Sequence, residues 1–216
     1  MATAAELASL RERIANILTT DPCQRIQFNV PGFSFRPGAF MVIGVSLKFS
    51  DAAHRVPGYR GRPMHVSVVR MPANTGAMYH AHSNTIAVPR ASFGATPWER
   101  QALVHESVHA VFDYQRVRLA AFQEEACAYI AGSMFRRLTG TIEAGATGID
   151  AAADLISIDL CITGAGSRGL SLSPWTTDVT AAQMQTLIAE IRRSPTYRGL
   201  RSERAGFRYA HDGGTL

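Results

Sequence analysis

The spacing of apolar residues predicts helices at both ends of the chain. Near the N-terminus, apolar side chains recur at helical spacing through residues 4–19, which predicts an amphipathic helix. Residues 119–138 and 150–162 are also expected to be helical, so helices should fill much of the second half of the chain. Residues 180–193 predict a last amphipathic helix, whose inward positions are Met184, Leu187, Ile188 and Ile191.

A different pattern follows the first helix. Three segments are rich in β-branched and aromatic residues and are separated by Pro and Gly, which predicts strands. These segments are residues 25–30, 40–49 and 65–72. Two shorter runs, 77–82 and 85–89, are joined by Ser83-Asn84 and predict a hairpin. The order of helix, strands and then helices is typical of an α+β fold.

The most clearly marked helix lies in the middle of the chain. Thr96-Pro97-Trp98-Glu99 supplies an N-cap Thr, a Pro at the first helical position and a Glu that completes a capping box. The helix is expected to extend to Tyr114, and it is apolar nearly all round, which predicts burial. One stripe of it carries Trp98, Ala102, His105, His109 and Phe112.

Two histidines lie one turn apart on this helix, in the motif His105-Glu106-Ser107-Val108-His109. Side chains four residues apart share a helix face, with about 5–6 Å between their Cβ atoms, so both imidazoles can bind one zinc ion. Glu106 is then beside the metal without binding it, where a general base belongs. Burying these polar groups without partners would be costly, which favours a metal site over histidines that merely fill the core.

A catalytic zinc ion needs a third protein ligand. A third histidine on the motif helix is ruled out by Gln115, and Asp113 is nearly in line with both histidines, so it is better suited to support a ligand than to be one. The next helix offers Glu124 and Glu125. Glu125 flanks the apolar stripe of that helix, whereas Glu124 points nearly the opposite way, so we expect Glu125 to be the ligand. The alternative is that both are solvent-exposed carboxylates near a helix start.

With a Glu on the helix after H-E-x-x-H, the chain resembles the gluzincin group of zinc metallopeptidases. The run His105–Tyr114 is similar to the motif helix of thermolysin-type enzymes, and the resemblance covers residues 77–138. The chain differs from the thermolysin pattern in the short interval from His109 to Glu125, and in having Tyr129 where that family carries an Asp.

The resemblance implies a single zincin-like domain over residues 1–216. Its small mixed sheet and motif helix would form a lobe at 1–115, and the helical lobe would comprise 116–216. It further implies that zinc, held by His105, His109 and Glu125, serves in hydrolysis of a peptide or protein substrate, with Glu106 as the general base.

The resemblance also implies that the strand ahead of the motif helix, Ala77–His82, pairs with extended substrate. His80 and His82 would share one face of this strand, and together with Tyr129 they are candidate substrate-binding residues. A solvent-facing hairpin end is the alternative for the two histidines. The donor that stabilises the developing oxyanion stays open among six side chains. They are Tyr79, His80, His82, Tyr129, Tyr197 and His211.

Composition narrows the function classes. The chain has 216 residues, a net charge of +5 and 46% hydrophobic residues, which is ordinary for a soluble globular protein. Arginines gather in the last quarter, but no nucleic-acid-binding motif accompanies them, so a nucleic-acid partner is not expected. Three cysteines without C-x-x-C spacing argue against a disulfide framework and against a cysteine-bound zinc. The N-terminus does not have the pattern of a secretory signal and no apolar run is long enough to span a membrane, so we expect a cytoplasmic protein.

Two further functions fit the same residues. One is a toxin or effector peptidase aimed at a competitor or host and exported without a signal peptide. The other is a zinc-stabilised binding module without enzymatic activity, which would use the basic C-terminal surface to bind an acidic partner.

Overall fold

The described part of the chain forms two compact units. The computed structural model describes residues 2–49, 63–72, 75–141, 145–165 and 178–198. The described residues of the first unit fall within Met1–Arg25 and Gly38–Arg118, and those of the second within Ile26–Pro37 and Leu119–Tyr209. The expectation of a single zincin-like domain stays a prediction.

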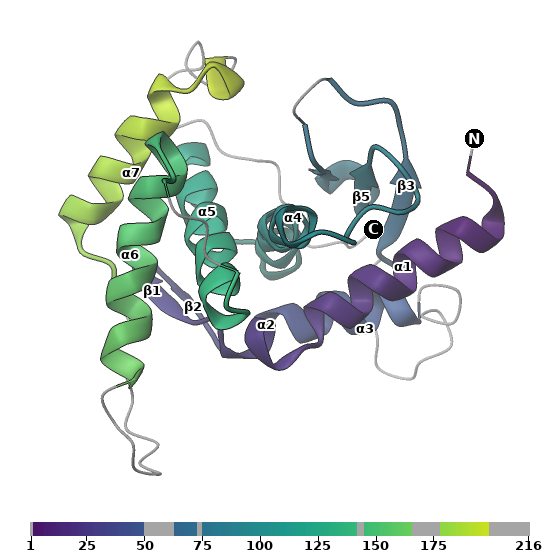
Figure 1. Cartoon of the computed structure of the whole chain (residues 1–216), viewed down its shortest axis with the longest axis horizontal. Coiled ribbons are helices and arrows are strands. Elements are labelled where there is room, and N and C mark those ends of the chain that lie inside the picture. Colours follow the sequence, from purple (N-terminus) through teal and green to yellow (C-terminus); the bar gives the residue numbers. More distant parts are fainter. Residues whose placement is uncertain (1, 50–62, 73–74, 142–144, 166–177, 199–216) are drawn as a thin grey trace. The chain divides into compact units, whose positions relative to one another are not determined.

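The first unit contains four helices among the described residues. They are α1 (Ala4–Leu18), α2 (Asp21–Arg25), α3 (Ala39–Lys48) and α4 (Pro97–Gln115). The capping box of α1 is formed by Thr3 and Glu6, and α1 confirms the first expected helix. α1 packs against α3 (Figure 1). The two helices approach closely at Gly44, where a Cβ atom would lie 3.2 Å from the backbone oxygen of Ala15 in α1 and 2.7 Å from Cγ2 of Thr19, which caps α1. A larger residue there would force the helices apart.

The strand expected at residues 40–49 is wrong, because this segment forms α3. The segment is apolar over almost its whole length, so periodicity does not separate a buried helix from a buried strand. In the folded unit, Phe40, Ile43 and Leu47 are buried at the spacing of one helical face, and α3 packs against both α1 and α4. The β-branched and aromatic composition of this segment favours a strand. Packing against the neighbouring helices stabilises a helix instead.

The sheet of the first unit has three strands among the described residues: β3 (His65–Val68), β4 (Met78–His80) and β5 (Thr85–Val88). β5 lies in the middle, parallel to β3 and antiparallel to β4, so the sheet is mixed as expected. The expected hairpin is confirmed by β4 and β5, in which Tyr79 lies opposite Ile86. Its connection is the short 3₁₀ helix η2 (Ala81–Ser83), followed by Asn84 in the left-handed region at φ 47°. β4 is therefore an edge strand of the described sheet.

The second unit combines a hairpin with three helices. In the hairpin, β1 (Phe28–Val30) pairs antiparallel with β2 (Phe33–Phe35), and the ring of Phe28 stacks on that of Phe35 with centroids 5.2 Å apart. β1 confirms the strand expected at residues 25–30, whereas neither β2 nor α2 of the first unit was expected.

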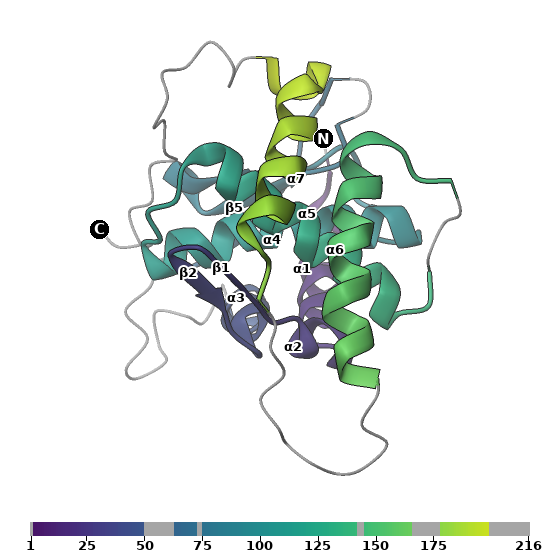
Figure 2. The same ribbon diagram turned by 90° about the vertical axis from the view of Figure 1, so that its left-hand side faces the viewer.

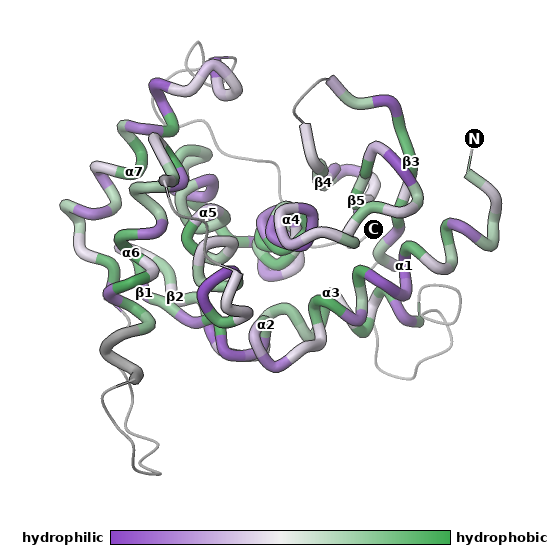
Figure 3. Tube along the Cα trace, viewed as in Figure 1, coloured by the Kyte–Doolittle hydropathy of each residue, from purple (hydrophilic) through white to green (hydrophobic). Residues whose placement is uncertain are grey.

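The three helices of the second unit are α5 (Ala121–Leu138), α6 (Gly148–Ala165) and α7 (Ala181–Arg193), and the short 3₁₀ helix η3 (Pro195–Tyr197) follows them. They pack against one another, and Figure 2 shows them side by side. Both hydrophobic and hydrophilic residues occur along α7, as the colours of Figure 3 show. The four inward positions expected in this helix are confirmed as buried: Met184, Leu187, Ile188 and Ile191.

The elements of both units make this an α+β structure, as the sequence predicts. Among the described residues, no helix has the length and apolar character that crossing a membrane requires.

Candidate metal centre

The start of the motif helix α4 is fixed by a buried carboxylate. Glu99, with an exposed fraction of 2%, accepts hydrogen bonds on Oε2 from the backbone N–H groups of Gly94 (3.1 Å), Ala95 (2.8 Å) and Thr96 (3.0 Å). Its Oε1 pairs with the guanidinium of Arg90. The backbone N–H of Glu99 in turn donates a hydrogen bond to the Thr96 hydroxyl, so the expected capping box is confirmed.

The two histidines of the motif share one side of α4. The ring centroids of His105 and His109 are 5.4 Å apart, with an angle of 67° between the ring planes. His109 is buried and His105 is half-buried. The expectation that α4 is buried all round is wrong at two exposed aromatic residues, Trp98 and Tyr114. The stripe that carries the histidines is therefore open to solvent at its N-terminal end, at Trp98.

The carboxylate between the histidines is held by the edge strand. Oε2 of Glu106 accepts a hydrogen bond of 2.7 Å from the backbone N–H of Tyr79, and Oε1 lies 4.0 Å from Nε2 of His105. The Tyr79 N–H is thereby directed at α4 and not into the ladder between β4 and β5. Glu106 consequently lies at the outer edge of the sheet, next to the histidine pair.

Tyr79 makes a second connection between β4 and α4, through its side chain. Its hydroxyl donates a hydrogen bond of 2.6 Å to Oδ2 of Asp113, which is fully buried, and also lies 2.9 Å from Oδ1 of Asn84. The hydrogen bond to Asp113 thus holds β4 beside the motif helix α4. Sequence reasoning considered Tyr79 only as an oxyanion donor, and the local pattern holds no signal for a contact between residues 34 positions apart.

Both candidate carboxylates of α5 are buried, with exposed fractions of 0% for Glu124 and 5% for Glu125. The alternative of two solvent-exposed carboxylates is therefore wrong. The two differ in their relation to the histidines. One ligand atom each from His105, His109 and Glu125 lie within 4.8 Å of one another, a group that could hold a metal ion, and Glu124 does not belong to it.

A tyrosine contacts the carboxylate of Glu125. The hydroxyl of Tyr197, in η3, donates a hydrogen bond of 2.8 Å to Oε2 of Glu125 and lies 3.1 Å from the hydroxyl of Tyr129. Burial raises the pKa of Tyr197 well above its usual range, and the negative charge of Glu125 raises this pKa further. Tyr197 therefore keeps its proton and remains a hydrogen-bond donor to Glu125.

The remaining predicted residues lie in different environments. His80 is exposed on β4, but the strand ends there and His82 belongs to η2, so the expectation that the two share a strand face is wrong. Alternation of side chains does not extend into a 3₁₀ helix. His211, like the arginines from Arg201 onwards, lies outside the described residues. Substrate binding by His80, His82 and Tyr129 stays a prediction.

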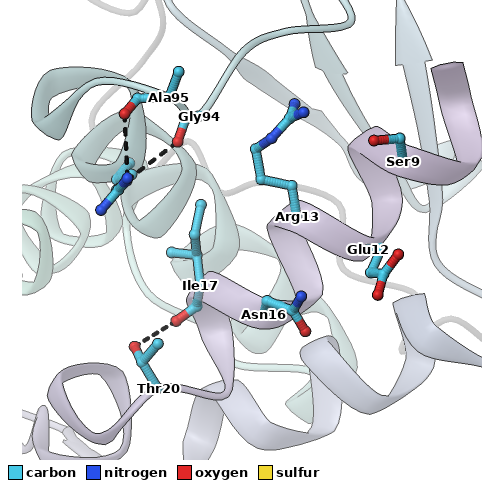
Figure 4. Close-up of a pocket in the computed structure, with 9 residues that line it drawn as sticks. Ser9, Glu12, Arg13, Asn16, Ile17, Thr20, Gly94 and Ala95 are labelled. Carbon is cyan, nitrogen blue, oxygen red and sulfur yellow. Dashed lines mark hydrogen bonds between the residues drawn. The ribbon is translucent and has the colours of Figure 1, made fainter.

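A shallow hollow of about 450 Å³ occurs elsewhere on the first unit, between α1 and the loop before α4 (Figure 4). Two arginines that line it are bound to that loop. Arg13 donates to the carbonyl oxygens of Ala91 and Phe93, and Arg100 donates to those of Gly94 and Ala95. These contacts assign the arginines a structural role, which is to hold the loop that leads into the motif helix.

Comparison of the chain with protein-family models, with curated proteins and with solved structures finds no match.

Proposed function

We propose that the chain is a zinc-dependent peptidase in which His105, His109 and Glu125 hold the metal. The observation that carries this proposal is the convergence of their ligand atoms within 4.8 Å. Two imidazoles and one carboxylate are a known donor set of catalytic zinc sites. Ligand atoms around one tetrahedral zinc lie about 3.4 Å apart, because each bond is about 2.0–2.1 Å long. Small side-chain rotations are enough to bring the three groups to that spacing.

The protein groups around the proposed metal are suited to hydrolysis. A zinc ion bound there would act as a Lewis acid and lower the pKa of a bound water toward neutrality. Glu106 is the proposed general base, which takes a proton from the attacking water and passes it to the leaving amine. The hydrogen bond from the Tyr79 N–H fixes one oxygen of Glu106 at 2.7 Å, so the carboxylate has a defined orientation beside the histidines. Tyr197 orients the Glu125 carboxylate through its hydrogen bond of 2.8 Å.

A peptide is the substrate class that the neighbouring elements favour. β4 is an edge strand of the described sheet, and Glu106 lies at its outer edge. An extended peptide can lie along such an edge and form backbone hydrogen bonds with the outward groups other than the Tyr79 N–H, which is bonded to Glu106. The mixed sheet ahead of the motif helix supports a zincin-like arrangement, which is part of the proposal.

Metal analysis and two substitutions test the proposed chemistry. In the 216-residue chain, Glu106→Gln should keep bound zinc and lower kcat for peptide cleavage by about 10²–10⁴-fold, because it removes the general base and no ligand. His105→Ala should lose zinc. A Glu106→Gln protein that cleaves an unbiased peptide library as well as wild type would refute the peptidase and favour the zinc-stabilised binding module.

The choice of third ligand has its own matched pair of variants. Glu125→Gln should weaken zinc binding in a chelator competition, whereas Glu124→Gln, a change of the adjacent buried carboxylate, should leave zinc affinity unchanged. The reverse result would assign Glu124 as the ligand.

Expression of the wild type and of Glu106→Gln in cells separates a toxin from other peptidases, because only a toxin injures cells in a Glu106-dependent way.

A further inference from the structure

An exposed aromatic residue lies on the same face of α4 as the two histidines. At 3.6 residues per turn, Trp98 is within about 20° of both His105 and His109 when α4 is viewed down its axis. It precedes His105 by seven positions, which corresponds to about 10 Å along the helix. Trp98 is 51% exposed, and tryptophan is a residue type that is enriched at binding interfaces.

The chain that leads into β4 follows this face of the helix. At Gly76, a Cβ atom would lie 2.8 Å from Cη2 of Trp98 and 3.2 Å from Cβ of Ala102, so the backbone of Gly76 lies directly against the indole. Three residues further on, Tyr79 is bonded to Glu106 through its N–H and to Asp113 through its hydroxyl. Residues 76–79 therefore run alongside α4, from its first turn toward the motif.

From this arrangement we propose that Trp98 binds an aromatic or large apolar side chain of the substrate, about three residues from the bond that is cleaved. A peptide paired with the outer edge of β4 advances about 3.3 Å per residue, so the 10 Å between Trp98 and His105 corresponds to about three residues. The indole offers a large, rigid apolar surface to such a side chain. This inference rests on the proposed peptidase function and adds its substrate preference.

The packing of Trp98 leaves this surface available. One edge of the indole contacts Gly76, and the ring meets that of Phe93 edge-on with centroids 6.2 Å apart. These contacts fix the orientation of the indole, while half of its surface still faces solvent. An anchored aromatic side chain loses little entropy when it binds a ligand.

Tyr114 provides a matched control on the same helix. It is 44% exposed, but it lies about 160° around α4 from Trp98, on the opposite side from the histidines. Trp98→Ala and Tyr114→Ala thus remove exposed aromatic rings from opposite faces of one helix. Trp98→Phe keeps an aromatic ring against Gly76 and Phe93.

The experiment compares cleavage of a peptide library by zinc-loaded variants of the whole 216-residue chain. Wild type should prefer an aromatic or large apolar residue at one position about three residues from the cleaved bond. Trp98→Ala should lose that preference, with kcat/KM for the best peptide falling about tenfold through KM. Its kcat and zinc content should be unchanged. Trp98→Phe should retain most of the preference, and Tyr114→Ala all of it.

The outcomes separate this inference from the function on which it rests. If cleavage depends on Glu106 and Trp98→Ala keeps the wild-type preference, only the role of Trp98 is overturned. If wild type cleaves no peptide, or Glu106→Gln cleaves normally, both proposals fail. Binding gives an independent readout: in a Glu106→Gln, Trp175→Phe protein, Trp98 is the only tryptophan, and the best-cleaved peptide should change its fluorescence.

Discussion

Glu99 shows how one residue positions the motif from two turns away. Its carboxylate accepts three backbone hydrogen bonds from the loop that ends at Thr96, and its other oxygen pairs with Arg90. These N–H groups belong to residues that precede α4, where the chain is not yet helical and no helix hydrogen bond satisfies them. Glu99 therefore ties the first turn of α4 to the preceding loop, and the motif residues follow on the same rigid helix.

We expect Glu99→Gln to lower the free energy of unfolding by about 2–3 kcal/mol, because hydrogen bonds to a charged acceptor are lost in a buried setting. Urea unfolding followed by circular dichroism measures this change. Glu12→Gln is the control, since Glu12 is exposed on α1 and the same substitution there should change the stability by less than about 0.5 kcal/mol. Equal effects of the two substitutions would contradict the assigned role of Glu99.

At the scale of elements, the attachment of β4 to α4 is the contact that places the edge strand beside the motif. Tyr79 supplies both connections, one from its backbone to Glu106 and one from its hydroxyl to Asp113. A strand of three residues has few ladder hydrogen bonds of its own, so these two bonds form a large part of its attachment.

Tyr79→Phe should therefore loosen the strand while leaving the helix intact. It removes the donor to the buried Asp113, and we expect the unfolding free energy to fall by about 1–3 kcal/mol. Amide hydrogen exchange in residues 78–88 should become faster, because local opening of the hairpin costs less. Tyr114→Phe, which removes an exposed hydroxyl from α4, should change neither quantity. Unchanged exchange in the hairpin of Tyr79→Phe would show that the hydroxyl does not hold the strand.

The elements that the sequence predicts correctly are those marked by local chemistry. Thr96 and Glu99 mark the start of α4 within four residues, and the periodicity of α7 identifies its buried face. Residues 40–49 were misjudged because a uniformly apolar segment takes its conformation from its neighbours. The hydrogen bond between Tyr197 and Glu125 joins residues 72 positions apart, and no local pattern reports such a contact. The candidate metal ligands could be named because their spacing on each helix is local; the groups that orient them could not.

At the scale of the whole molecule, one fully buried cysteine lies in each unit. Cys23 belongs to the first unit and Cys127 to the second, and both have no exposed surface. Burial raises the pKa of Cys23 to about 12 and raises that of Cys127 as well. Only a thiolate reacts readily with alkylating reagents, so burial and protonation both protect these residues. The reactivity of each thiol then reports the integrity of its own unit.

Both thiols also make stability fall at alkaline pH. The unfolded thiol of Cys23 ionises near pH 9.0 and the folded one near 12, so the unfolded state loses its proton first as pH rises. This contribution is complete below pH 9 and is lost between about pH 9 and 12, on the order of 1–2 kcal/mol by pH 10.5. Urea unfolding at pH 8 and pH 10.5 should therefore show a smaller loss of stability in Cys23→Ala than in wild type.

In native protein at pH 8, iodoacetamide should label the partly exposed Cys161 and spare Cys23 and Cys127, as mass spectrometry can show. Labelling of either buried thiol at the rate of Cys161 would contradict this burial.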